Sequence, residues 1–352
     1  MSVQAVIWLP LAASVLLGAS ASRLGRLLPP ATAVRLLTAA SLMCALGTGF
    51  ALTVAGFVVL AQVPAVAALG HWSSGVVRNG HLVPVAAGGP AGVVVTVLLA
   101  SALWRALRAG HDLALSALLC RRLGPAVAGL VVVEDDIPDA YALPGLSGRV
   151  VVSTAMLAAL PADERAVLLA HEAAHLAHRH YAYVQLADLA AAANPVLRPV
   201  ARAVRVAVER WADEVAAAEV GDRRLAARAL ARAGLARAAA SRRTAADPVL
   251  AAGTALAALD AHVADRALAL LGPLPPARRA LAVVVLAATV ATGAASVITE
   301  HVTEARFELA QIAYDHHGSP RGRSTDEATG TGDRALPAGR VVLGPVVVSM
   351  YY

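Results

Sequence analysis

Long apolar runs separated by short polar connections dominate the pattern of this chain. Four of the runs reach about 20 residues, the length that an α-helix needs to cross the hydrocarbon core of a bilayer. They cover roughly residues 3–21, 36–63, 82–104 and 280–299. The pattern therefore predicts three transmembrane helices within residues 1–104 and a fourth at residues 280–299. A more polar segment, residues 105–279, lies between the third helix and the fourth.

The first apolar run has two interpretations. Ala19-Ser20-Ala21 resembles the small-residue site at which a secretory signal is cleaved. However, no positive charge precedes the run, and Arg23 and Arg26 follow it. This order of charges favours an uncleaved helix whose N-terminus lies outside the cell.

Arginines in the connections predict the orientation of the helices. The first connection carries three arginines and no acid, whereas the second carries one arginine, and arginines also open and close the segment 105–279. Because cytoplasmic loops carry the excess of basic residues, we expect a multi-pass protein of the cell membrane with residues 105–279 in the cytoplasm. Both termini are then external. Residues 300–352 are expected to form a largely disordered tail, because Gly, Ser, Thr and charged residues are frequent there.

The composition agrees with burial in lipid. Hydrophobic residues make up 58% of the chain and the mean hydropathy is +0.64, against roughly 45–50% apolar residues in soluble domains. The charge of +6 would also suit a nucleic-acid binder, but no basic stripe with interleaved aromatic residues is present, so direct nucleic-acid binding is not expected. The two cysteines, Cys44 and Cys120, provide neither a disulfide framework nor a cysteine-based zinc site.

The segment 105–279 contains short β-like runs followed by a long helical pattern. Runs rich in β-branched or aromatic residues lie at 130–133, 141–143 and 149–152, separated by acidic, Pro and Gly residues. From Ser153 onward the pattern is helical, with breaks at Asn194-Pro195 and Gly221-Asp222. We therefore expect an α+β domain within a chain that is mostly α.

The strongest chemical signal is His171-Glu172-x-x-His175, in a stretch of strong helix formers. Residues i and i+4 of a helix share a face, so both imidazoles can bind one zinc ion. Glu172 is then placed to act as the general base toward a zinc-activated water. A satisfied core histidine is the ordinary interpretation of a lone His, but two of them around a Glu in an otherwise apolar helix would leave three polar groups to satisfy in one place.

Catalytic zinc usually has three protein ligands, so a third donor is required. Glu209 is the best candidate, because it lies on a helix after the Asn194-Pro195 break. Asp213, one turn further on, could accept the second ring N–H of a ligating histidine. The alternatives are a solvated carboxylate at Glu209, or a ligand at Glu214 or Glu219.

Two further groups of residues have more than one interpretation. His178 and His180 follow the motif, and we expect helix-surface or interface positions for them, since zinc needs no fourth protein ligand here. Arg149, Val150, Val151 and Val152 form a candidate substrate strand, because an edge strand near the metal could pair with an extended peptide. A plain sheet strand with a covered edge fits this run equally well.

Together, His171-Glu172-x-x-His175 and Glu209-x-x-Ala212-Asp213 resemble the gluzincin-type membrane peptidases. That group includes the HtpX-like proteases, the CAAX prenyl proteases and the beta-lactam-sensor signal-transducing metallopeptidases. Residues 142–145 and 149–153 are similar to the strand pair that precedes the motif helix in this group. Three helices before the domain and one after it favour the beta-lactam-sensor type. The resemblance thus implies a four-helix transmembrane protein with a cytoplasmic gluzincin domain between helices three and four.

The resemblance also implies the activity and its partners. It indicates a zinc metalloendopeptidase with one Zn²⁺ per chain that cleaves a protein or peptide, with a DNA-binding transcriptional repressor as the first candidate. Beta-lactam sensors carry an external penicillin-binding domain after the last helix. No Ser-x-x-Lys signature follows residue 299 here, so sensing by that route is not expected. The alternatives are an HtpX-like quality-control protease and a membrane signalling receptor whose metal site is structural.

Overall fold

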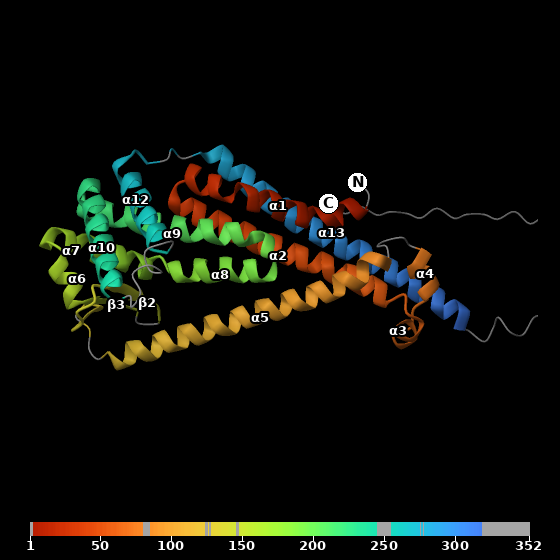
Figure 1. Cartoon of the computed structure of the whole chain (residues 1–352). Coiled ribbons are helices and arrows are strands. Elements are labelled where there is room, and N and C mark those ends of the chain that lie inside the picture. The colour runs from red at the N-terminus through yellow and green to blue at the C-terminus, as the bar shows by residue number, and fades with distance from the viewer. Residues whose placement is uncertain are drawn as a thin grey trace, which may run out of the picture.

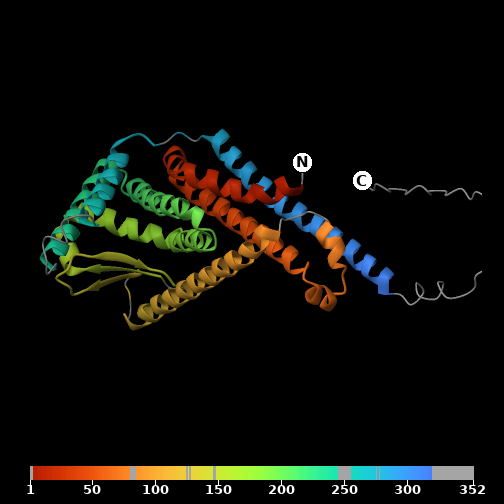
Figure 2. The same ribbon diagram turned by 45° about the vertical axis from the view of Figure 1, so that its right-hand side comes forward.

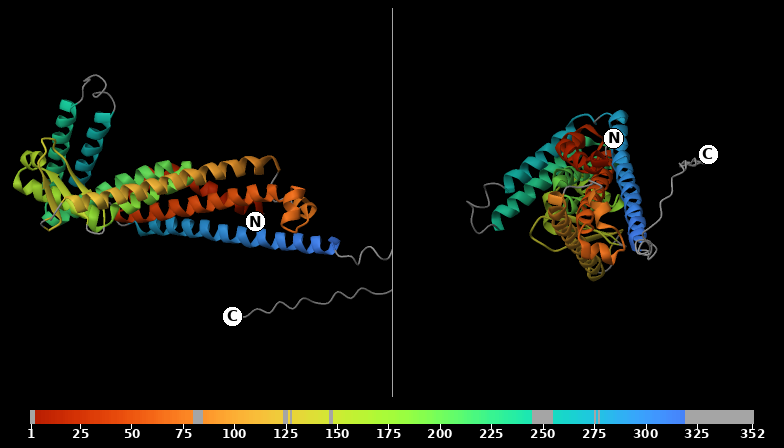
Figure 3. Two further views of the ribbon diagram at one scale, coloured as in Figure 1. Left: turned by 90° about the horizontal axis from the view of Figure 1, so that it is seen from below. Right: turned by 90° about the vertical axis from the view of Figure 1, so that its right-hand side faces the viewer.

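The structure is a computed structural model that describes residues 3–79, 85–123, 126, 128–145, 148–244, 255–274, 276 and 278–318. It is elongated, with long helices extending from one end and a small sheet with shorter helices at the other (Figures 1 and 3). The last part of the predicted tail, residues 319–352, lies outside the described residues.

Each predicted apolar run forms all or part of a long helix. The helices are α1 (Val3–Leu27), α2 (Pro30–Leu60), α5 (Val85–Arg122) and α13 (Arg279–Gly318). Pro30 opens α2, where the missing N–H of proline costs no hydrogen bond. α2 packs against the other three helices. The short helices α3 (Pro64–Leu69) and α4 (Ser74–Asn79) lie at the end of the bundle that is far from the sheet (Figure 1).

Two helices of the described chain, at Pro30–Leu60 and Pro90–Arg122, are long and apolar enough to cross a membrane. In the second one, only 11% of the most apolar window is buried within the protein. Apolar side chains along it, such as Val93, Leu99 and Leu107, are more than half exposed. This surface indicates association with a membrane. The four-helix topology stays a prediction.

α5 and α13 extend far beyond their predicted ends at residues 104 and 299. α5 continues unbroken past Trp104 to Arg122 and brings Cys120 against the sheet residues Leu143 and Val151. α13 continues to Gly318. The prediction of a largely disordered tail from residue 300 is therefore wrong for residues 300–318. The apolar residues Phe307 and Ala310 explain the helix there, since both pack in a cluster with Val58 and Trp72.

A three-stranded sheet lies beside the last turns of α5 (Figure 2). Its strands are β1 (Leu130–Val133), β2 (Ala140–Leu143) and β3 (Arg149–Ser153). β3 is central, parallel to β1 and antiparallel to β2. Because both sides of β3 are paired, the prediction that Arg149, Val150, Val151 and Val152 form a substrate-binding edge strand is wrong. Val151 and Val152 are fully buried, as expected for the middle of a covered sheet.

The rest of the domain is helical. Its elements are α6 (Thr154–Ala159), α7 (Ala162–Ala177), α8 (His180–Ala193), the 3₁₀ helix η1 (Pro195–Leu197), α9 (Arg198–Val220), α10 (Arg223–Thr244) and α12 (Ala255–Leu271). Local signals set several boundaries. Asn194 ends α8 and its side chain accepts a hydrogen bond from Val196 N. Gly221 ends α9 with φ of +72°, a conformation that glycine adopts without strain.

The largest core cluster joins the α8–α9 hairpin to α1 and α2. It includes Leu28, Leu37, Val200 and Val204, all buried to within 1% exposure. Close to the hairpin turn, Asn194 Nδ2 donates to Ser14 Oγ at 2.9 Å and to Thr48 Oγ1 at 3.3 Å. α9, which carries Glu209 and Asp213, is therefore fixed against the long helices as well as against α7.

Candidate metal centre

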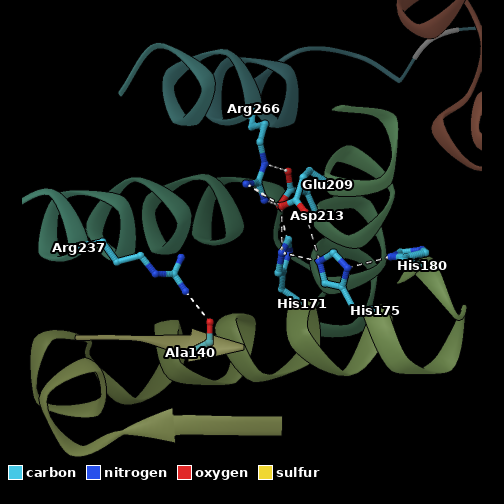
Figure 4. A network of polar contacts seen from close by, with 8 residues as sticks. All are labelled: Ala140, His171, His175, His180, Glu209, Asp213, Arg237 and Arg266. Atoms are coloured by element: carbon cyan, nitrogen blue, oxygen red, sulfur yellow. Dashed lines mark hydrogen bonds and ion pairs between the residues drawn. The ribbon is translucent and has the colours of Figure 1, made fainter. Parts of the chain in front are cut away.

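The His-Glu-x-x-His motif lies within α7, one face of which points toward α9 (Figure 4). His171 and His175 are one helical turn apart, and their Nε2 atoms lie 3.2 Å from each other. Both imidazoles are mostly buried, with side-chain exposures of 13% and 19%. The helix therefore presents two imidazole nitrogens at one point in space.

Glu209 approaches the same point from α9. One carboxylate oxygen is 3.6 Å from His171 Nε2 and the other is 3.7 Å from His175 Nε2. Donor atoms bound to one zinc ion at about 2.0–2.1 Å in a tetrahedron lie about 3.3 Å apart. The three groups form a possible metal site, with all ligand atoms within 4.8 Å of one another. The donor set of two imidazoles and one carboxylate fits zinc in both spacing and chemistry.

Asp213 lies behind His171. Its Oδ1 is 3.0 Å from His171 Nδ1, and the residue is 5% exposed. Burial alone would lower the pKa of His171, but the hydrogen bonds to Asp213 and Glu209 outweigh it and raise this pKa to about 9. A carboxylate at Nδ1 also directs the Nε2 lone pair of a neutral ring toward a metal. The structure thus brings Asp213 to the position expected from the sequence.

His180 lies behind His175, although the sequence indicates a surface or interface position. The chain turns at Arg179, whose φ of +51° is left-handed, and α8 then begins with His180. His180 is 1% exposed, and its Nδ1 is 3.2 Å from His175 Nδ1. Burial and the neighbouring histidines lower the pKa values of His175 to about 4 and of His180 to about 3. The surface prediction for His180 is wrong, because α8 folds back and buries its first residue against Trp211.

Arg266 is a site residue that the sequence analysis missed. It extends from α12, donates to both Asp213 oxygens at 2.8 and 2.6 Å, and lies 3.0 Å from Glu209 Oε2 (Figure 4). Burial alone would raise the pKa of Glu209, but His171 and Arg266 hold it at about 2. The same two partners keep the pKa of Asp213 below its usual range against burial. Both carboxylates are therefore ionised.

Glu172 lines a cavity of about 390 Å³ together with His171 and His175. The residue is 7% exposed. Burial raises the pKa of its carboxyl, while His171 and Arg237 oppose the rise. An acid that is easier to protonate than usual, placed beside two candidate ligands, is suited to accept and return a proton.

The sheet edge formed by β2 lies along this cavity, which Ala140, Tyr141 and Ala142 also line. Asp139 O accepts a hydrogen bond from Ser153 N, so Asp139 faces β3. Because residues alternate in direction along an antiparallel pair, Ala140 and Ala142 present their N–H and C=O groups at the open edge of β2. Arg237 Nη2 donates to Ala140 O at 2.7 Å, and Asp139 Oδ1 accepts from Ala140 N.

These features support a metallopeptidase domain of the zincin type at residues 120–279. Residues 120–279 match the sequence model of peptidase family M48, and this stretch includes the motif helix, Glu209, Asp213 and Arg266. The match indicates a metallopeptidase domain in this part of the chain. No curated protein and no solved structure matches the chain.

Proposed function

We propose that this chain is a zinc-dependent endopeptidase of the cell membrane. The observation that carries the proposal is the convergence of His171, His175 and Glu209 within 4.8 Å, with Glu172 in the same cavity. His171, His175 and Glu209 would bind one Zn²⁺ per chain. The ion would polarise the scissile carbonyl and lower the pKa of water at the site.

The chain's own residues would position and move the proton. Glu172 acts as the general base, receives a proton at its carboxylate from the attacking water and passes it to the leaving amine. Asp213 and His180 hold the two ligating imidazoles in orientation through their Nδ1 atoms. Arg266 keeps Asp213 ionised and restrains Glu209.

The substrate strand of this proposal is β2 instead of β3. An extended peptide could add to the open edge of β2 by backbone pairing, which places its scissile bond in the cavity beside Glu172. Since Arg237 and Asp139 already engage the backbone of Ala140, pairing would use Ala142. Among the described residues of β2, Ala142 would then set the register of the substrate.

The membrane placement and the physiological substrate also belong to the proposal. The exposed apolar face of α5 and the arginine distribution support a multi-pass protein with residues 105–279 in the cytoplasm. A transcriptional repressor is the first candidate substrate, and quality control of membrane proteins is the second. The alternative from another class is a signalling receptor in which the metal is structural. Ionised Glu209 and buried Glu172 favour the enzyme, because a structural site needs no buried base.

The test compares cells that express the intact chain, Glu172→Gln or His175→Ala, by mass spectrometry of new protein N-termini and by zinc content of the purified proteins. Loss of the general base should lower cleavage by about 10²–10⁴-fold with zinc retained, whereas His175→Ala should lose both. Glu219→Gln, an exposed residue of the same type on α9, is the matched control. Cleavage by Glu172→Gln at the intact level would disprove the mechanism and favour the receptor.

A further inference from the structure

A second cavity, of about 730 Å³, shares Arg266 with the metal centre. Its walls come from three helices that are far apart in sequence. Ser22, Gly25 and Arg26 belong to the last turns of α1, Arg202 and Arg210 to α9, and Asp265 and Arg266 to α12. It is thus formed where the first long helix meets the domain.

The charges in this cavity are unbalanced. Arg26 and Arg202 are exposed, and neither has an ion-pair partner within the described part of the chain. Arg210 uses Nη1 to donate to Gly25 O at 3.1 Å, which leaves four of its five N–H donors. The charge of Arg266 is already engaged by Asp213 and Glu209. Asp265 is the one acidic residue among the lining residues, so Arg26, Arg202 and Arg210 carry two charges in excess.

The cavity also has an apolar wall. Pro199, Ala203, Val206 and Ala269 line it beside the arginines. Its α1 residues directly follow residues 3–21, the run that the sequence predicts to end at the cytoplasmic face of the membrane. A ligand with an anionic head and an adjoining apolar part would match both surfaces.

We propose that this cavity binds a phosphate group, supplied by the headgroup of an anionic phospholipid. Guanidinium groups form paired, charge-assisted hydrogen bonds to phosphate oxygens. Basic pockets next to membrane helices on the cytoplasmic side suit such headgroups. This binding needs no metal and no cleavage, so it stands or fails independently of the peptidase activity.

The test uses the purified full-length chain in a neutral detergent. Binding of short-chain phosphatidylglycerol, phosphatidylcholine of the same chain length and inorganic phosphate is measured by native mass spectrometry. Arg26→Gln/Arg202→Gln should weaken phosphatidylglycerol binding at least about tenfold, since each arginine near an anionic lipid contributes roughly fivefold. The matched control is Arg23→Gln/Arg198→Gln, which removes two exposed charges from the same two helices but outside the cavity. It should change binding by less than about twofold.

Each outcome decides the proposal. Binding of phosphatidylglycerol well above both other probes supports a lipid headgroup. Equal binding of inorganic phosphate supports a phosphate site that a soluble ligand supplies. Equal binding of phosphatidylcholine, or equal losses in the two double variants, would overturn the proposal. Arg202→Gln alone, at an exposed position, repeats the test if the double variant does not fold.

Discussion

The two sides of the metal centre have opposite electrostatic character. On one side, His171 Nδ1 meets the charged pair of Asp213 and Arg266. On the other, His175 Nδ1 meets the neutral ring of His180, which packs against Trp211 with ring centroids 4.7 Å apart. The two histidines are one turn apart on the same helix, yet the pKa of His171 rises to about 9 and that of His175 falls to about 4.

One helix face can therefore present two unlike imidazoles to one ion. Without metal, near neutral pH, His171 carries a proton and His175 offers a lone pair, and the two Nε2 atoms are 3.2 Å apart. One proton thus occupies the place where a cation would bind. Zinc must displace it, because only deprotonated imidazole is a ligand. The charged side therefore sets the proton competition and also orients His171. The neutral side orients His175 and adds no proton competition near neutral pH.

The largest expected effect is the pH dependence of zinc affinity. His171 is protonated in the metal-free protein below a pKa of about 9, so each pH unit below 9 weakens binding about tenfold. His175, with a pKa of about 4, adds no slope above pH 5. Between pH 6 and pH 9 the affinity should rise about 500-fold, because His171 is still half protonated at pH 9. Competition with a chelator of known pH dependence measures this rise. In Asp213→Asn, which removes the carboxylate from Nδ1, the slope should flatten; an unchanged slope would contradict this origin.

Removal of Asp213, on the charged side of the metal centre, should have the next largest effect on zinc affinity. Asp213→Ala deprives His171 of its acceptor and Arg266 of both of its Asp213 contacts. At pH 9, where the proton on His171 competes little with zinc, the affinity should fall by about 10–100-fold, as is typical when a partner of a ligating histidine is removed. Asp222→Ala, which removes an exposed carboxylate directly before α10, is the control and should bind zinc normally. Equal affinities in the two variants would show that Asp213 does not orient His171.

Removal of His180, the neutral partner of His175, should lower the zinc affinity less than removal of Asp213 does. His180→Phe keeps a buried aromatic ring but removes the Nδ1 that pairs with His175 Nδ1. It also removes the His180 Nε2 atom, which has no hydrogen-bond partner within the described residues. A buried nitrogen without a partner destabilises the folded state, so its removal should stabilise the protein. Zinc affinity should fall about tenfold while the thermal unfolding midpoint of the metal-free protein stays equal or rises. A lower midpoint together with unchanged zinc affinity would reverse these roles.

The sequence could predict those residues of this site that follow from helical periodicity, and it missed those that tertiary packing brings in. His171, Glu172 and His175 follow from the spacing of one helix, and Asp213 follows from Glu209 by the same rule. Arg266 did not follow, since α12 reaches the site through tertiary packing and a lone arginine in an apolar helix usually extends to water. The sequence predicts a surface or interface position for His180, and not a buried one behind His175, for a related reason. The reversal at Arg179 is a left-handed conformation that no glycine or asparagine marks.

In the fold too, local patterns predict the elements, whereas their arrangement depends on tertiary packing. The long helices and short strands could be predicted from apolar runs and β-branched residues, although the order of strands could not. A run such as Arg149 to Val152 has the same local pattern in the middle of a sheet as at its edge. The packing of α8 and α9 along α1 and α2 depends on many small residues, such as Ala187, Ala190 and Ala203. Single alanines carry no directional signal in a sequence.

The smallest expected change in the metal centre comes from Trp211→Phe. Trp211 packs on the rings of His178 and His180 and lies under Arg35 at 5.0 Å. Phenylalanine keeps the apolar contact but loses ring area and part of the cation–π attraction, about 1 kcal/mol in the free energy of unfolding. The unfolding midpoint should fall by about 2–4 °C with zinc affinity within about threefold of the intact chain. Trp104→Phe is the matched control, because Trp104 also lies under an arginine, Arg108, but is exposed on α5 away from the histidines. A tenfold loss of zinc affinity in Trp211→Phe alone would mean that the neutral side acts through the packing of His180 more than through its hydrogen bond.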